Sequence, residues 1–310
     1  MKRILLTGAS GFVAAHVLDA FLKQGYFVRF TVRTQEKADQ VLDANSQYRA
    51  QLEATIVPGK LRHRRWTSNL SLTTDVAADG AYDEVLKDDT VDGIIHTASP
   101  FHTRFSDPQE LLEPAIRGTE GLLLAIVKLA PRVKRVVIIS SYAAIMNPEK
   151  GNWPGHTYTE KDWNPVTMDQ ALHGSKITTY RASKTFAERA AWEFVSKHKP
   201  NFDLVTLCPP MVYGPIINAQ TLSSINTSNE AIYKYLNGET KTVEPMFHPF
   251  WVDVRDVAAA HLSAYETPAA GGHRFFIVAD EVYSSQDMVD ALRKVSSFPP
   301  ASDSNVDHPF

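Results

Sequence analysis

A glycine-rich turn near the start of the chain constrains the fold more than any other feature. Residues 3–7, with Ile4, Leu5 and Leu6 at their centre, are predicted to form a short buried strand; Gly8 and Gly11 follow it, and apolar residues then recur at helical spacing. A second strand is predicted at residues 26–33. This strand, turn, helix and strand predict a βαβ unit, whose crossover requires a parallel sheet with helices on its faces.

The same alternation continues along the chain. Further strands are predicted at residues 54–57, 91–97, 133–140 and 203–207, and further helices at 36–53, 81–87, 109–130, 179–197, 230–236, 254–265 and 285–295. We therefore predict an α/β fold, a Rossmann-type doubly wound parallel sheet of about seven strands in residues 1–208. Residues 209–310 are expected to form mainly a small C-terminal substrate lobe, over the carboxyl ends of the strands where such sheets bind ligands.

Two stretches interrupt this pattern. Residues 59–74 have neither strand nor helix period and are interpreted as an irregular insertion. The last residues, from 298 on, resemble a frayed tail where a final strand and helix are expected, so the lobe is predicted to be truncated. The insertion carries basic residues around Trp66, but an isolated basic loop in a chain of net charge -3 does not predict a nucleic-acid partner.

Composition and run lengths predict a cytoplasmic protein. The longest later apolar run, residues 122–127, is far too short to cross a bilayer, so no membrane partner is expected. The single cysteine, Cys208, cannot form an intrachain disulfide, which suits a reducing compartment. The histidines lack the spacing of metal ligands, so no metal is expected. Nothing in the sequence indicates the oligomeric state.

The position of the glycine turn predicts a dinucleotide site. Between a strand and a helix, glycines let backbone N–H groups and the helix dipole meet a pyrophosphate. The end of the second strand separates NAD from NADP, because a carboxylate there binds the ribose hydroxyl and basic residues accommodate a 2′-phosphate. This strand end has Arg33 and Lys37 and no carboxylate, which favours NADP(H). The alternative is that both are solvated residues at a helix start.

A Tyr-x-x-x-Lys pattern supplies candidate chemistry. Tyr180 and Lys184 lie four residues apart at the start of a predicted helix, so both project from one face. A phenol, with a pKa of about 10, is a poor acid–base catalyst unless a nearby ammonium favours its phenolate. A hydroxyl is also needed to hold a substrate carbonyl, and Ser140 and Ser141 stand where a predicted strand ends. The residues alone leave both serines open.

Together these motifs, with His-Thr-Ala-Ser-Pro at residues 96–100 and Asp-Val-Arg-Asp-Val-Ala at 253–258, resemble the extended short-chain dehydrogenases/reductases. Within that family the chain is most similar to fungal NADPH-dependent carbonyl reductases, which are related to dihydroflavonol 4-reductase and cinnamoyl-CoA reductase. The resemblance implies that Ser141 is the catalytic serine, that Tyr180 donates the proton and that Lys184 lowers the pKa of Tyr180. It implies cofactor contacts by Gly8, Ala9, Ser10, Gly11, Phe12, Val13, Arg33, Lys37, Asp75, Val76, Thr97, Ala98, Ser99, Tyr180, Lys184, Pro209, Val212 and Ser228.

The resemblance implies that a small-molecule aldehyde or ketone is reduced to an alcohol. Apolar pocket candidates are Phe101, Tyr142, Ile145, Met211, Phe247 and Trp251, each of which is equally compatible with the core. An epimerase or dehydratase of the same fold is an alternative. Such an enzyme keeps NAD bound, and Arg33 and Lys37 argue against it because they favour NADP(H). A second alternative is a non-catalytic NADP-binding protein that the insertion and the short tail have disabled.

Overall fold

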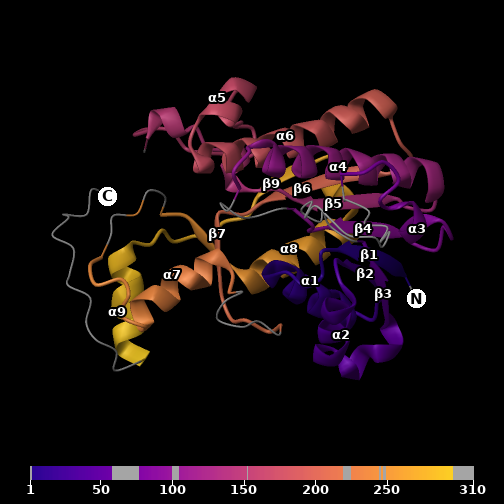
Figure 1. The fold of residues 1–310 in the computed structure, drawn as a ribbon, viewed down its shortest axis with the longest axis horizontal. Coiled ribbons are helices and arrows are strands. Elements are labelled where there is room, and N and C mark those ends of the chain that lie inside the picture. Colours follow the sequence, from indigo (N-terminus) through magenta and orange to yellow (C-terminus); the bar gives the residue numbers. More distant parts are fainter. Residues whose placement is uncertain are drawn as a thin grey trace, which may run out of the picture.

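The computed structural model describes residues 2–57, 77–99, 105–151, 153–218, 225–243, 246 and 249–295 (Figure 1). The described residues do not include the predicted insertion at 59–74, the expected cofactor contacts Asp75 and Val76, or the chain after residue 295. Two pocket candidates, Phe101 and Phe247, lie outside them as well.

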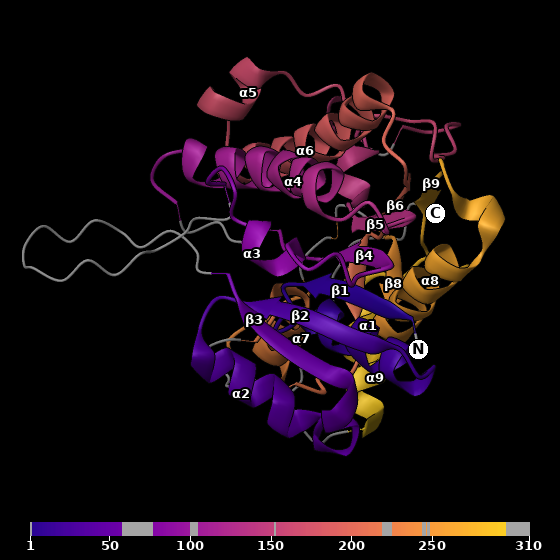
Figure 2. The same ribbon diagram turned by 90° about the vertical axis from the view of Figure 1, so that its right-hand side faces the viewer.

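A seven-stranded sheet forms the centre of the molecule, in the order β3-β2-β1-β4-β5-β6-β9 (Figure 2). Every neighbouring pair in it is parallel. Its strands are β1 Arg3–Thr7, β2 Phe27–Val32, β3 Leu52–Ile56, β4 Gly93–His96, β5 Arg135–Ile139, β6 Asp203–Cys208 and β9 Arg274–Phe276. The strand order reverses between β1 and β4, where doubly wound sheets open a ligand crevice. The predicted fold class is confirmed.

Helices cover both faces of this sheet. In Figure 1, α4 (Gln109–Leu129) and α6 (Lys176–His198) lie above it, and α1 (Phe12–Lys23) and α8 (Val254–Glu266) lie below it. The alternation within β1 supplies both cores, because Ile4 and Leu6 pack on the α1 side and Leu5 packs on the α4 side. All three side chains are fully buried. The apolar run at 4–6 is continuous because both faces of the strand are covered.

The predicted helix at residues 36–53 is wrong in its second half. Helix α2 covers Gln35–Ala44, a 3₁₀ segment covers Ser46–Gln51, and β3 begins at Leu52. Asn45 ends the helix, since its side-chain amide donates to the carbonyl of Val41 at 2.8 Å. Each of residues 52–56 then pairs with a residue of β2, so sheet pairing overrides helical propensity there.

The chain after residue 208 divides between the sheet and a smaller unit. Strand β9 and helix α8 join the main sheet and its lower face. Strands β7 (Met211–Tyr213) and β8 (Trp251–Asp253) pair in a separate sheet, and α7 (Thr227–Leu236) contacts both β7 and α9 (Ser285–Val295). Sequence reasoning missed β7, β8 and β9 because three residues are too few for a period to show. It also missed α5 (Met168–His173), whereas α3 (Asp83–Leu86) is shorter than predicted.

None of the helices in the described ranges combines the length and apolarity that a bilayer span requires.

Candidate active site

The glycine turn packs directly against the loop that follows β4. Gly8 has a φ of 73°, and a Cβ placed on it would stand 2.9 Å from the Cα of Ala98. Only glycine adopts this backbone readily and also permits so close an approach. The turn after β1 and residues 97–99 after β4 therefore form one rigid floor at the carboxyl ends of adjacent strands.

The buried hydroxyl of Thr7 holds the loop after β4 in place. Thr7 Oγ1 accepts hydrogen bonds from the backbone N–H groups of Thr97, at 3.2 Å, and Ala98, at 3.1 Å. The same hydroxyl lies 2.8 Å from Nδ1 of His96. Both lone pairs of this oxygen are thus occupied, so its O–H donates to Nδ1 of His96, a ring whose pKa burial lowers to about 4. Thr97 in turn donates its hydroxyl to the carbonyl of Thr7 at 2.5 Å.

The start of α1 fits an anion. Gly11 is its N-cap residue and supplies no capping side chain, so the first-turn N–H groups at Phe12 and Val13 lack the side-chain acceptor that caps other helices here. Such a helix terminus attracts a phosphate through its N–H groups and dipole. Ala9 and Ser10 complete the turn, with Ala9 held by its N–H bond to the carbonyl of Thr31 at 3.0 Å.

Two cations flank the end of β2, as predicted for a 2′-phosphate site. Arg33 is exposed and Lys37 is half-buried. Within the described ranges no carboxylate forms an ion pair with either of them. Thr34 caps α2 between them by accepting the N–H of Lys37 at 3.3 Å. Their charges are thus available to a ligand. The same geometry also fits the alternative that both are solvated residues at a helix start.

Helix α6 brings the Tyr-x-x-x-Lys pair to the carboxyl end of β5. The half-buried Tyr180 forms a hydrogen bond with the side chain of Ser141, whose Oγ also accepts the N–H of Ala143 at 3.1 Å. Burial raises the pKa of Tyr180 to about 12, and the Ser141 hydrogen bond opposes that rise. In the absence of a cofactor the phenol is therefore protonated at neutral pH. The expected lowering of its pKa by Lys184 stays a prediction.

The ammonium of Lys184 contacts the same loop, residues 97–99. It is buried, and its Nζ donates to Ser99 Oγ at 2.8 Å. Burial lowers its pKa to about 8. Ser99 follows Thr97 and Ala98, so the loop that packs on the glycine turn also sets the place of Lys184.

The two adjacent serines have different surroundings, which the sequence alone left open. Ser140 is buried and donates its hydroxyl to a carboxylate oxygen of Glu188 at 2.5 Å. Ser141 instead turns toward Tyr180. The geometry thus favours Ser141 as the serine that faces a substrate. Sequence reasoning missed Glu188, although its place four residues after Lys184 put it on the same helix face.

The small unit brings two further predicted cofactor residues together. Ser228, at the start of α7, donates its hydroxyl to the carbonyl of Val212 in β7 at 2.6 Å. The carbonyl of Pro209 accepts the N–H of Tyr142 at 2.9 Å, which joins this segment to the residues after Ser141.

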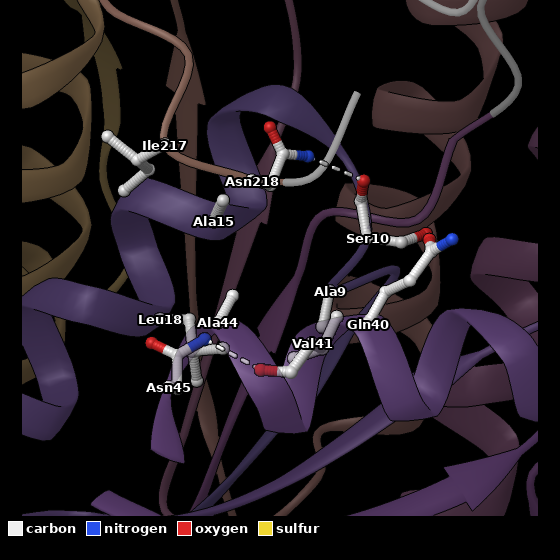
Figure 3. A pocket seen from close by; sticks show the side chains of 10 residues that line it. All are labelled: Ala9, Ser10, Ala15, Leu18, Gln40, Val41, Ala44, Asn45, Ile217 and Asn218. Atoms are coloured by element: carbon white, nitrogen blue, oxygen red, sulfur yellow. Dashed lines mark hydrogen bonds between the residues drawn. The ribbon is translucent and has the colours of Figure 1, made fainter. Parts of the chain in front are cut away.

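The segment after β7 reaches back to the glycine turn. Asn218 donates to the carbonyl of Ser10 at 2.9 Å, and His16 donates to the carbonyl of Pro215 at 2.8 Å. Figure 3 shows the pocket that forms beside the turn, between α1 and α2, with Asn218 and Ser10 at its rim. It is lined by Ala9, Ser10, Ala15, Leu18, Gln40, Val41, Ala44, Asn45, Ile217 and Asn218.

Comparison with known proteins identifies the family. Residues 4–279 match the model described as the NAD dependent epimerase/dehydratase family. This chain belongs to that family. The predicted resemblance to extended short-chain dehydrogenases/reductases is confirmed.

Named relatives of this epimerase/dehydratase-family chain are reductases. It is 43% identical to the ketoreductase azaE of Aspergillus niger, with 94% of this chain and 82% of the relative covered. It is 33% identical to the NADPH-dependent methylglyoxal reductase GRE2 of Saccharomyces cerevisiae, with the same two shares covered. Among solved structures, that of Gre2 in complex with NADPH from Candida albicans matches with a TM-score of 0.82 and 34% identity, covering 95% of this chain and 82% of that one.

The side chains predicted to line the substrate pocket differ in how exposed they are. Tyr142 and Ile145 are buried in an aromatic cluster with Phe250 and Phe276, so they belong to the core. Met211 is 39% exposed, next to Val212, and remains a lining candidate. Trp251 is half-buried and donates its indole N–H to the carbonyl of Glu281 at 3.0 Å.

Proposed function

We propose that this chain reduces an aldehyde or ketone to an alcohol with NADPH. The observation that carries the proposal is the convergence of Ser141, Tyr180 and Lys184 at the carboxyl ends of β4 and β5, next to the glycine turn. The named relatives support the same reaction, since a ketoreductase and an NADPH-dependent methylglyoxal reductase are among them.

The residues present fit NADPH along the edge of the sheet. The start of α1, with Gly8, Gly11 and the N–H groups at Phe12 and Val13, suits the pyrophosphate. Arg33 and Lys37 suit the 2′-phosphate. The remaining cofactor contacts are assigned to Ala9, Ser10, Thr97, Ala98, Ser99, Tyr180, Lys184, Pro209, Val212 and Ser228. When bound, NADPH supplies the hydride.

The protein's own side chains orient the carbonyl and supply the proton. Ser141 has one acceptor position filled by the N–H of Ala143, which leaves its O–H to hold the carbonyl oxygen. Tyr180, which the same hydroxyl contacts, donates its phenolic proton to that oxygen as negative charge develops there. Lys184 stabilises the phenolate that remains, because an opposite charge nearby favours the ionised form.

A reducing compartment suits this assignment. We place the protein in the cytosol, where NADPH is available and where a free, buried thiol such as that of Cys208 is stable. The substrate is a small-molecule aldehyde or ketone, and the exposed Met211 remains a candidate for the lining of its pocket.

NADPH oxidation against a panel of aldehydes and ketones tests the function. Tyr180→Phe is expected to lower turnover by roughly a hundred- to ten-thousand-fold, whereas the Kd for NADPH, measured by fluorescence, should rise far less because the other assigned contacts remain. NADH in place of NADPH is the cofactor control. Undiminished turnover in Tyr180→Phe would overturn the assignment of the proton donor. NADPH binding without oxidation of the cofactor by any carbonyl would overturn the reductase.

A further inference from the structure

A single buried carboxylate ties the catalytic helix to three strands. Glu188 lies eight residues after Tyr180 on α6 and is only 2% exposed. Besides the bond from Ser140 at the end of β5, it accepts the hydroxyl of Thr206 in β6 at 2.7 Å. The guanidinium of Arg274 in β9 donates to both of its oxygens, at 2.7 and 3.1 Å.

The partner of this carboxylate reaches the other side of the catalytic serine. Arg274, whose side chain is 7% exposed, donates to the carbonyl of Ala144 at 3.1 Å. It also donates to the carbonyls of Glu160, at 3.0 Å, and Asp162, at 2.5 Å. Its guanidinium stacks 3.8 Å from the ring centroid of Trp163. The buried pair therefore holds the chain on both sides of Ser141, through the side-chain hydroxyl of Ser140 before it and the backbone carbonyl of Ala144 after it.

We propose that Glu188 and Arg274 are a positioning pair that holds Ser141 in register with Tyr180. This proposal rests on the proposed function, because it concerns the same reaction. Neither residue is among those assigned above to the substrate or the cofactor. The pair acts by fixing the position of α6 relative to the segment after β5 that carries Ser141.

The geometry explains why one pair can do this. With a rise of about 1.5 Å per residue, Glu188 anchors α6 roughly 12 Å from Tyr180 on the same helix face, with Lys184 halfway between. A helix is stiff over that length, so a displacement at Glu188 is transmitted to Tyr180. A misplacement of about 1 Å at reacting atoms is enough to lower the rate about a hundredfold.

The test compares two ion pairs that lie near opposite ends of β5 and β6. Glu188→Gln removes the charge at the carboxyl ends of β5 and β6 and keeps the side-chain length. The control is Asp203→Asn at the amino ends, where Arg135 makes the same two-pronged contact with Asp203, at 2.7 and 2.9 Å. Both variants lose stability, but only Glu188→Gln alters the site.

We expect Glu188→Gln to lower kcat between about 10- and 100-fold, with the Kd for NADPH within about twofold of wild type. Asp203→Asn keeps kcat within about twofold of wild type per folded molecule. Equal kcat losses in the two variants, or none in Glu188→Gln, would overturn the proposal, because the pair would then serve stability alone. Thermal melting of each variant sets the temperature at which both are folded.

A milder comparison covers the case in which Glu188→Gln does not fold. Ser140→Ala removes one bond to the carboxylate and leaves the ion pair intact. Thr119→Val removes a comparably buried hydroxyl, which donates to the carbonyl of Ala115 at 2.8 Å on α4. We expect a kcat loss of about tenfold for Ser140→Ala only. Similar kcat values in both variants would count against the positioning role.

A substrate-free measurement separates this proposal from the proposed function. In protein labelled with ¹³C at Tyr Cζ, the Tyr180 resonance is identified by its loss in Tyr180→Phe. Its chemical shift reports the hydrogen bond with Ser141. The shift is expected to change in Glu188→Gln and not in Asp203→Asn, whether or not wild type turns over any carbonyl. An unmoved Tyr180 resonance in Glu188→Gln would refute the positioning pair, whereas an inactive wild type refutes the reductase.

Discussion

Replacing Gly8 by alanine tests the idea that the glycine turn and the loop after β4 form one floor. At a φ of 73° an L-residue costs about 1–2 kcal/mol, of which about 0.4–1 kcal/mol is regained from a less flexible unfolded chain. The new Cβ would also stand 2.9 Å from the Cα of Ala98, closer than real contacts allow. Overpacking of this kind adds about 1–3 kcal/mol. Gly8→Ala should therefore lower the free energy of unfolding by about 1–5 kcal/mol.

Gly25 provides the matched control, since its φ of 79° is nearly the same and nothing lies within 4 Å of a Cβ added there. Urea denaturation of Gly25→Ala should give a loss of about 1 kcal/mol, so the difference between the variants isolates the contact with Ala98. The same contact displaces residues 97–99, so Gly8→Ala should also bind NADPH more weakly, whereas Gly25→Ala should not. Equal losses of stability, or unchanged NADPH affinity in Gly8→Ala, would refute the reasoning.

Three further predictions follow from named contacts. Arg33→Ala should raise the Kd for NADPH at least tenfold more than that for NADH, measured by fluorescence titration; a parallel rise would mean that Arg33 does not meet the 2′-phosphate. Ser99→Ala removes the acceptor of Lys184 Nζ and should raise KM for NADPH more than it lowers kcat, which steady-state kinetics would detect. Burial lowers the pKa of Lys184 to about 8 from 10.5. Between these pH values the unfolded chain binds more protons than the folded protein. The free energy of unfolding of the cofactor-free protein should therefore rise as the pH rises from about 8 to 10. In Lys184→Met that gain should vanish in urea melts at pH 8 and pH 10, and a persistent gain would contradict the assignment.

Much of the fold follows from local pattern. Buried strands such as β1 and β5 and the long helices α1, α4, α6 and α8 are evident as apolar runs and helical periods, because these elements face a core along most of their length. The turn at Gly8 and the spacing of Tyr180 and Lys184 likewise depend on neighbours in sequence. These features predicted the fold class, the family and the candidate site.

Elements that depend on distant partners were predicted less well. The helix predicted through residue 53 gives way to β3 because β2 supplies an unpaired edge, and the three-residue strands exist only through their partners. Local propensity contains no information about such pairings.

The chain by itself thus determined which residues carry chemistry, and the tertiary structure decided how they are used. Ser140 and Ser141 are identical neighbours in sequence, and only the fold turns one toward Glu188 and the other toward Tyr180. Glu188 meets Arg274 across 86 positions of the chain. The physical reason is that hydrogen bonds and burial depend on distance in space, which periodicity and spacing along the sequence do not specify.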